Sequence, residues 1–294
     1  MASMRDIKRR KGSIQSTGQI TKAMKLVSTV KLQKAKGHAQ EAKPYFHYLY
    51  EAMHSILKKS GTISHPMLST GEGTAPSKKA VIVITSNRGL AGGYNANVVK
   101  LLTKGDIPKD EVKVFAIGTK GRDTLSRGGY QVCNDYSEVM NEPLYSDAVR
   151  IGRDVMKAYT SGEVGEIYLA YTVFKNTVTH IPTLIKLLPI SGEENQEEEK
   201  EEKNDLDSLT LMNYEPEPEE VLDKIIPKYI NGIIYGALIE AVAAENGARM
   251  QAMDNATNNA EDMIADLSLK YNRARQGSIT QELTEIVAGA SAIE

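Results

Sequence analysis

The sequence predicts an α/β protein in which a central open-sheet domain is flanked by two long helices that pair as an antiparallel coiled coil. Three observations favour this class. At both ends of the 294-residue chain, apolar residues recur at spacings of three and four. In the middle, short β-branched runs alternate with helical segments. The two ends also carry opposite net charge, which favours pairing with each other.

The first predicted helix occupies residues 1–58 and begins near Met4. Pro44 interrupts its pattern, and we expect a bend there rather than an end. Residues 1–36 contain ten Lys or Arg and one acid, Asp6, for a net charge of +9. The expected seam consists of Ile20, Ala23, Val27 and Val30 and, after a slip of one residue, Ala35, Ala39, Ala42, Phe46, Leu49, Met53 and Ile56.

A basic start has two other interpretations, a targeting peptide or an arm that binds nucleic acid. The helical pattern continues to about Lys59 without a Gly-Pro break, which favours a permanent helix. The apolar stretches, such as 233–244, are shorter than the ~20 residues that a spanning helix needs, so we expect no membrane-spanning segment.

Residues 59–77 are predicted to be a linker and residues 78–192 an α/β domain. Buried strands are expected at 80–85 and 112–117, and two more at 166–174 and 178–188. Helices are expected from Asn95, after the turn at 118–121, and over 146–159. The alternation predicts a Rossmann-like open sheet covered by helices.

A glycine-rich turn, SNRGLAGGY at 86–94, follows the first strand and precedes a helix, as phosphate-binding loops do. It lacks the GK[ST] of a P-loop, and its glycines do not form GxGxxG. The five histidines are scattered, and Cys133 is alone. We therefore predict no catalytic, cofactor-binding or metal site, and interpret the loop as a tight turn that packs a helix on the sheet.

Residues 193–216 begin with an acidic run, because 193–207 contains nine acids and two lysines. This run is too polar to order itself, so we expect a mobile loop without an assigned function. The second long helix is predicted over 217–294, with Pro218 and acids in its first turn. Residues 237–294 contain nine acids and four basic residues, a balance of −5.

Small and apolar residues mark the expected contact face of this second helix. Alanine recurs every four residues from Ala244 to Ala260, which forms a shallow stripe for another helix. The apolar periodicity runs through Val221, Ile225, Tyr229, Ile233, Leu238, Val242, Met250, Met253, Met263, Leu267, Ile279, Leu283 and Ile286.

Four segments resemble the gamma subunit of F-type ATP synthases. The C-terminal ITQELTEIVAGA at 279–290 is similar to the signature of that family, and RDIK at 5–8 with ITKAMKLV at 20–27 is similar to its opening helix. SNRGLAGGYN at 86–95 resembles its mid-domain turn, and YEP at 214–216 its lower segment. The lone Cys133 lacks the partner of the regulatory cysteine pair of chloroplast relatives. The missing presequence favours a bacterial-type protein.

The resemblance implies a non-catalytic rotor shaft that couples transmembrane ion flow to ATP synthesis or hydrolysis on the beta subunits. Expected partners are the alpha and beta subunits of the catalytic ring, the epsilon subunit and the membrane rotor ring. Expected localisation is peripheral, on the cytoplasmic face of the cell membrane. No cofactor is implied. The residues matching beta-subunit contacts are Met24, Lys25, Arg275, Gln276, Thr280 and Glu282, and those matching the foot near the membrane ring and epsilon are Tyr214 and Glu215.

Two alternatives from other functional classes stay open on the residues alone. One is a nucleotide-binding enzyme that uses the glycine-rich loop at 86–95. The other is a coiled-coil scaffold that binds nucleic acid through residues 1–36. The choice between proton and sodium coupling is not written in the sequence.

Overall fold

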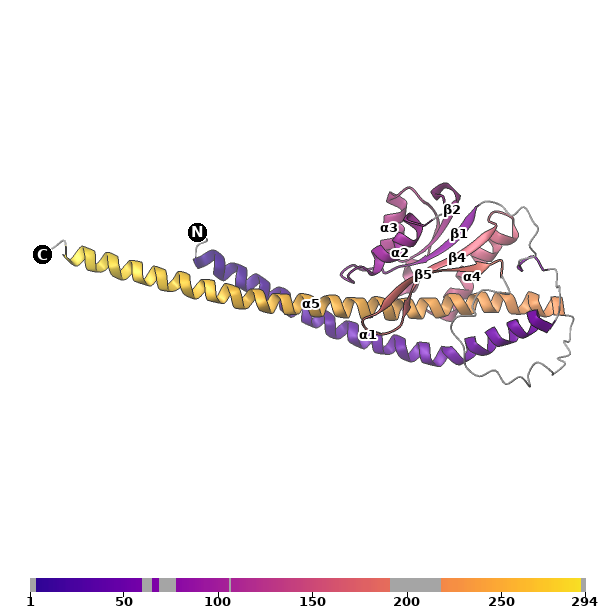
Figure 1. The fold of residues 1–294 in the computed structure, drawn as a ribbon, viewed down its shortest axis with the longest axis horizontal. Coiled ribbons are helices and arrows are strands. Elements are labelled where there is room, and N and C mark those ends of the chain that lie inside the picture. Colours follow the sequence, from indigo (N-terminus) through magenta and orange to yellow (C-terminus); the bar gives the residue numbers. More distant parts are fainter. Residues whose placement is uncertain (1–3, 60–64, 69–77, 106, 191–217, 292–294) are drawn as a thin grey trace. The chain divides into compact units, whose positions relative to one another are not determined.

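A computed structural model describes residues 4–59, 65–68, 78–105, 107–190 and 218–291 (Figure 1). The chain divides into two compact units, each described by itself below. Unit 1 comprises Met1–Val30 and Arg249–Glu294, and unit 2 comprises Lys31–Ala248. The predicted foot residues Tyr214 and Glu215 and the acidic run at 193–207 lie outside the described residues.

Two long helices, three shorter α-helices, two 3-10 helices and five strands make up the described chain. In order they are α1 (Met4–Lys59), β1 (Lys79–Ile84), α2 (Tyr94–Thr103), η1 (Lys109–Glu111), β2 (Val112–Ile117), α3 (Thr119–Arg127), β3 (Gln131–Asp135), η2 (Ser137–Asn141), α4 (Tyr145–Thr160), β4 (Glu166–Phe174), β5 (His180–Leu188) and α5 (Pro218–Ser291).

The five strands of unit 2 form one mixed sheet in the order β3-β2-β1-β4-β5. β1 pairs in parallel with β2 and β4, and β2 pairs in parallel with β3. β4 and β5 form an antiparallel hairpin that begins with the pair Phe174 and His180 at its tip. The central strands are apolar on both faces, because helices cover both sides of the sheet.

Each face of the sheet has its own hydrophobic core. On one face, β-strand residues such as Ile82 and Leu169 pack with Ile151 of α4 and with Ile226 and Ile234 of α5. On the other face, α2 and α3 pack on the alternate strand residues, as Val98 and Leu125 show. Figure 1 shows these layers. The expected open sheet covered by helices is confirmed, with part of α5 serving as a cover.

Strand β3 is missing from the sequence prediction. Its sequence, QVCND, alternates between exposed and half-buried residues, because it is an edge strand with no fully buried face. Such a strand buries little apolar area, so its sequence lacks the apolar run or alternation from which a strand is predicted.

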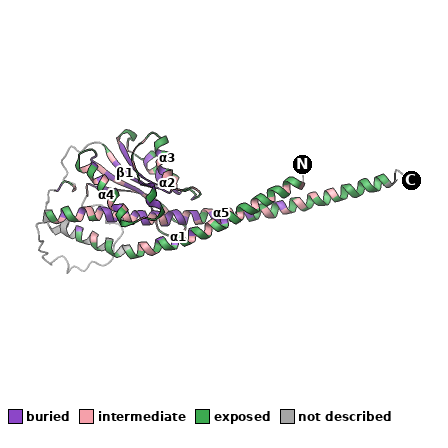
Figure 2. Cartoon of the chain, turned by 180° about the vertical axis from the view of Figure 1, so that it is seen from behind, coloured by how far each residue is buried: buried purple, intermediate pink, exposed green. Residues whose placement is uncertain are grey.

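Both long helices continue through their internal prolines, Pro44 in α1 and Pro227 in α5. In the described part of the chain, one helical span, Glu220–Gly289, is long and apolar enough by composition to cross a membrane, with a window of mean hydropathy 1.3. Half of that window is buried inside the protein, as expected of a helix that covers a sheet (Figure 2).

In unit 1 the two helices run antiparallel. Gly18 lies against Ala260, Thr21 contacts Thr257, and Lys25 contacts Asp254, so the numbering rises on α1 as it falls on α5. This confirms the predicted antiparallel pairing. On α1 of unit 1 the buried or half-buried positions of the seam, three and four residues apart, are Met4, Ile7, Lys11, Ile14, Gly18, Thr21, Lys25 and Ser28.

The predicted seam of α1 is wrong upstream of Ala35. Ile20, Val27 and Val30 are 60%, 58% and 66% exposed, and Ala23 is exposed too. The heptad that faces α5 is offset by one residue and combines apolar residues such as Ile7 and Ile14 with small and polar ones such as Gly18 and Thr21. On α5, Met263, Ile279, Leu283 and Ile286 are likewise exposed, whereas Met253 and Leu267 are buried as predicted.

Candidate functional site

Between Gly18 and Lys25, the contacts across the seam of unit 1 come from small and polar side chains. The hydroxyls of Thr21 and Thr257 lie 2.8 Å apart in a buried pair. Each hydroxyl also lies within hydrogen-bond distance of a carbonyl of its own helix: Thr21 of that of Gly18, and Thr257 of that of Met253. Nζ of Lys25 lies 2.6 Å from Oδ1 of Asp254, with both side chains less than half exposed. These contacts set the register of the pair but bury little apolar area.

Exposed apolar side chains gather on the outer surface of α1 in unit 1. Ile20, Val27 and Val30 lie at spacings of seven and three, and Leu26 beside them is 62% exposed. Large apolar residues scattered singly on a surface are ordinary, whereas a row along one helix indicates a surface that is covered in an assembly.

The C-terminal end of α5 has no facing helix among the described residues of unit 1. Extrapolating the register from Thr21 and Thr257 places Met4 opposite about Ala274. Beyond Ser278 every described side chain of α5 is exposed, and Figure 2 shows this end as green. The exposed apolar residues of this end are Ile279, Leu283, Ile286 and Val287.

The predicted beta-contact residues fall in unit 1, on both helices. Met24 and Lys25 are half-buried near the seam, and Lys25 is already paired with Asp254. The other four lie on α5 at or beyond the end of its pairing with α1, and all are exposed: Arg275, Gln276, Thr280 and Glu282. The Thr280 hydroxyl donates to the carbonyl of Gln276 within the helix.

In unit 2, residues of the glycine-rich loop form hydrogen bonds with neighbouring elements of the sheet domain. The Asn87 amide donates to the carbonyl of Ser137 at 2.7 Å and accepts from the Thr119 N–H at 3.0 Å. Oδ1 of Asn95 accepts from the N–H of Ser86 at 2.9 Å. These bonds join the end of β1 and the loop to α2, α3 and η2. These contacts support the interpretation as a packing turn.

Tyr94, at the end of this loop, reaches across to α5. Its ring is 4% exposed, and its hydroxyl donates to the carbonyl of Ala241 at 3.1 Å. Ala91 and Tyr94 pack on Ala244, with Phe174 beside them. Open α/β sheets hold ligands outside the carboxyl ends of their strands, where the strand order reverses. Here α5 and the Tyr94 ring pack at the loop that follows the carboxyl end of β1.

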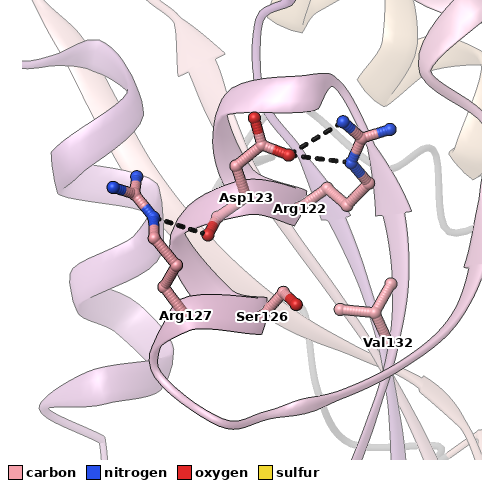
Figure 3. Close-up of a pocket in the computed structure, with 5 residues that line it drawn as sticks. All are labelled: Arg122, Asp123, Ser126, Arg127 and Val132. Carbon is pink, nitrogen blue, oxygen red and sulfur yellow. Dashed lines mark hydrogen bonds and ion pairs between the residues drawn. The ribbon is translucent and has the colours of Figure 1, made fainter.

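A shallow open hollow of about 550 Å³ lies on the outer side of α3 (Figure 3). Its lining is Arg122, Asp123, Ser126, Arg127 and Val132. Arg122 is bound to Asp123 and Asp135, and these hydrogen bonds raise the pKa of its guanidinium. The hollow contains no residue of the glycine-rich loop, and Arg122 in its lining is already paired with two carboxylates.

Known proteins resemble the chain over its whole length. The family model described as ATP synthase matches residues 3–293. The "ATP synthase gamma chain" of Lachnoclostridium phytofermentans is 67% identical over 293 residues, which covers all of both chains.

Solved structures share the fold at low identity. A chain of the Euglena gracilis mitochondrial ATP synthase, from a cryo-EM structure of OSCP, F1 and c-ring in rotational state 3, has a TM-score of 0.66 at 16% identity, covering 99% of this chain and 94% of that one. A chain from the central stalk and c-ring of the Tetrahymena thermophila enzyme has a TM-score of 0.57 at 22% identity, covering 81% and 99%.

Family membership decides between the functional classes. The full-length match to gamma chains sets aside both the nucleotide-binding enzyme and the nucleic-acid scaffold. The chain therefore belongs to the gamma-chain family of the F-type ATP synthases, as the non-catalytic central stalk of that enzyme.

Proposed function

We propose that unit 1 is the part of this rotor shaft that stands inside a ring of alternating alpha and beta subunits. Transmembrane ion flow turns the shaft, and the shaft biases each beta site by contacting it differently at each angle. The observation that carries this proposal is the exposure of three large apolar side chains near the end of α5, those of Ile279, Leu283 and Ile286.

The end of α5 exposes apolar surface to water, and burying that surface would be favourable. The helix from Ser278 to Ser291 is roughly 20 Å long at 1.5 Å per residue. Ile279, Leu283 and Ile286 are 45%, 58% and 68% exposed, and burying each would contribute about 1.5–3 kcal/mol in full. A surrounding ring would supply this burial.

Six residues are proposed to contact the beta subunits: Met24, Lys25, Arg275, Gln276, Thr280 and Glu282. The family resemblance supplies this assignment, and the exposure of the four on α5 supports it. Arg275 is the strongest candidate because a guanidinium can bind a carboxylate with two parallel hydrogen bonds. Lys25 would have to share its charge between Asp254 of its own chain and a beta-subunit acceptor.

We also propose that the chain meets the membrane ring and the epsilon subunit through Tyr214 and Glu215. Only the resemblance supports this contact. The complex is membrane-associated, and the proposed location of this chain is peripheral, on the cytoplasmic face of the cell membrane.

The experiment is Arg275→Ala in the assembled, membrane-bound complex. Removing one partner of a partly desolvated interfacial pair costs about 2–5 kcal/mol, so we expect clearly slower ATP hydrolysis and ATP-driven ion uptake in a complex that still assembles. The matched control is Arg273→Ala, an exposed arginine two positions earlier and about 200° around the helix. Wild-type rates for Arg275→Ala would show that the residue is merely solvated.

A further inference from the structure

The tip of the β4–β5 hairpin lies on α5 at a glycine. Phe174 and His180 form the pair at the tip, with ring centroids 5.9 Å apart. Nε2 of His180 is buried and has no hydrogen-bond partner among the described residues. A Cβ at position 247 would come within 2.7 Å of that nitrogen and 3.3 Å of Cε2 of Phe174. Glycine at 247 therefore permits the hairpin to approach α5 this closely.

The same stretch of α5 receives the glycine-rich loop. The Tyr94 hydroxyl binds the carbonyl of Ala241, and the Tyr94 ring packs on Ala244. Ala241, Ala244 and Gly247 follow each other at intervals of three, over about two turns of the helix. We call Tyr94, Phe174 and His180 the collar, since all three contact α5 between residues 241 and 247.

Two further contacts fix the hairpin tip itself. Nζ of Lys36 on α1 lies 5.0 Å from the centroid of the Phe174 ring, a cation–π contact. Burial lowers the pKa of His180, which keeps the imidazole neutral against the helix. Phe174 is thus placed by α1, by its own hairpin partner and by α5 together.

We infer that the collar sets the rotational angle of α5 against the sheet, so that its members are positioning residues for torque transfer. The inference rests on the role of the chain as the central stalk. Apolar burial keeps one face of α5 on the sheet but is non-directional, so it tolerates small rotations of the helix. A hydrogen bond to one carbonyl and a fit at one glycine hold it at a single angle.

The helix geometry shows how strict that angle is. Turning α5 by one residue position, about 100°, would replace Gly247 by Asn246 or Ala248. Either side chain would then meet the His180 ring. Unit 2 ends on α5 at Ala248, so the collar grips the helix at the boundary of this unit.

The test uses the complete membrane-bound complex with three variants. Gly247→Ala introduces the clash, His180→Ala deletes the ring without a clash, and Gly37→Ala is the control, because a Cβ at helical position 37 meets nothing within 4 Å. For each variant, the ATP hydrolysis rate and the ions taken up per ATP are measured, with a pH-sensitive dye and with labelled sodium.

We expect Gly247→Ala and His180→Ala to hydrolyse ATP at near wild-type rates while ion uptake per ATP falls several-fold. Gly37→Ala should match the wild type in both. The double variant Gly247→Ala, His180→Ala should recover part of the thermal stability without recovering ion uptake per ATP, because the closer of the two clashes is gone and the 3.3 Å contact with Phe174 stays.

Two results would overturn the inference. One is an unchanged ratio of ions to ATP in His180→Ala, which decides the matter even if Gly247→Ala fails to assemble. The other is recovery of the ratio together with stability in the double variant, which would reduce the collar to ordinary packing. Full ATP hydrolysis and ion uptake by a complex that lacks this chain would instead contradict its role as central stalk.

Discussion

The hydroxyl of Tyr94 donates a 3.1 Å hydrogen bond to the main-chain carbonyl of Ala241, and this bond connects the glycine-rich loop to the first half of α5. A loop whose composition suggests phosphate binding thus serves as a joint between the sheet and a long helix. The functional consequence is mechanical, since the joint lies in the unit that holds the helix on the sheet.

Removing that hydroxyl should weaken the joint without opening a cavity. We expect Tyr94→Phe to lower the free energy of unfolding of the full chain by about 0.5–1.5 kcal/mol, the usual net value of one hydrogen bond. Tyr94→Ala should cost more, about 3–5 kcal/mol, because the buried ring is lost as well. Urea unfolding followed by circular dichroism measures both. Equal stability of Tyr94→Phe and wild type would show that the bond contributes nothing.

Two helical glycines should respond to alanine with opposite signs. Gly37→Ala meets nothing within 4 Å and should stabilise the chain by about 0.5–1 kcal/mol, the helix propensity difference. Gly152→Ala should destabilise it by about 1–3 kcal/mol through overpacking, because its Cβ would overlap with Oδ1 of Asn231 on α5.

Asn231→Ala is the control for the predicted clash at Gly152. Oδ1 of Asn231 is buried without a hydrogen-bond partner among the described residues, so Asn231→Ala removes an unsatisfied group along with the obstacle. We expect Asn231→Ala to rescue Gly152→Ala, and thermal unfolding of the single and double variants measures the coupling. Strictly additive effects would mean that α4 and α5 do not touch at this point.

The pH dependence of stability should include a contribution from Glu166. Burial acts to raise the pKa of this carboxyl, but hydrogen bonds and charges from Lys186 and Lys79 outweigh it and lower the pKa to about 2. A lowered folded-state pKa stabilises above the unfolded value of 4.5, and that stabilisation is lost as the pH falls toward 2.

Glu166→Gln should therefore destabilise the chain near neutral pH and lose its effect in acid. Its side chain is about a quarter exposed, so we discount for screening and expect a cost on the order of 1–2 kcal/mol at about pH 7. Glu138→Gln is the control, since Glu138 forms an exposed ion pair with Arg150. Unfolding curves of Glu166→Gln and wild type that stay parallel down to about pH 3 would contradict the assignment.

The sequence predicts the sheet and the two helices well because their signals are local. Strands such as β1 and β2 are buried on both faces and read as continuous β-branched runs. The edge strand β3 leaves no such run, since its residues alternate between exposed and half-buried. Detecting it would require knowing that a parallel sheet continues beyond β2.

The coiled-coil seam is harder to predict, because in unit 1 the most apolar residues of α1 are not the buried ones. The most apolar row on α1, with Ile20, Val27 and Val30, faces outward, whereas Thr21 and Ser28 face inward. A protein that works inside an assembly keeps apolar surface for its partners, so a monomer-based pattern selects the wrong face. The heptad that faces α5 runs through Ile7, Ile14 and Thr21 and is less apolar than the outward row.

The partner-contact residues follow from resemblance rather than from physical chemistry. Arg275 and Glu282 are exposed polar residues on a helix, which ordinarily face water. Their proposed role depends on surfaces that belong to other chains. Residues that act within one chain, such as Tyr94 and Gly247, become apparent from the coordinates alone.

The buried threonine pair of unit 1 gives a last prediction about how the two helices recognise each other. Thr21 and Thr257 face each other at 2.8 Å, and each hydroxyl also lies close to a carbonyl of its own helix. Replacing both by valine removes both hydroxyls while the shape is kept, which is nearly neutral or stabilising for a buried pair.

A single replacement should cost more than the double one. Thr21→Val leaves the Thr257 hydroxyl with its helix carbonyl but without its cross-helix partner, so we expect a loss of about 0.5–1.5 kcal/mol in the free energy of unfolding. The double variant should recover most of it, a non-additivity that a double-mutant cycle measures. Thr280→Val is the matched control, because that hydroxyl bonds only within its own exposed turn. If the two single losses simply add in the double variant, the hydroxyls do not interact across the seam, and the register of α1 on α5 must be set by the neighbouring Gly18 and Ala260 contact and the Lys25 and Asp254 pair.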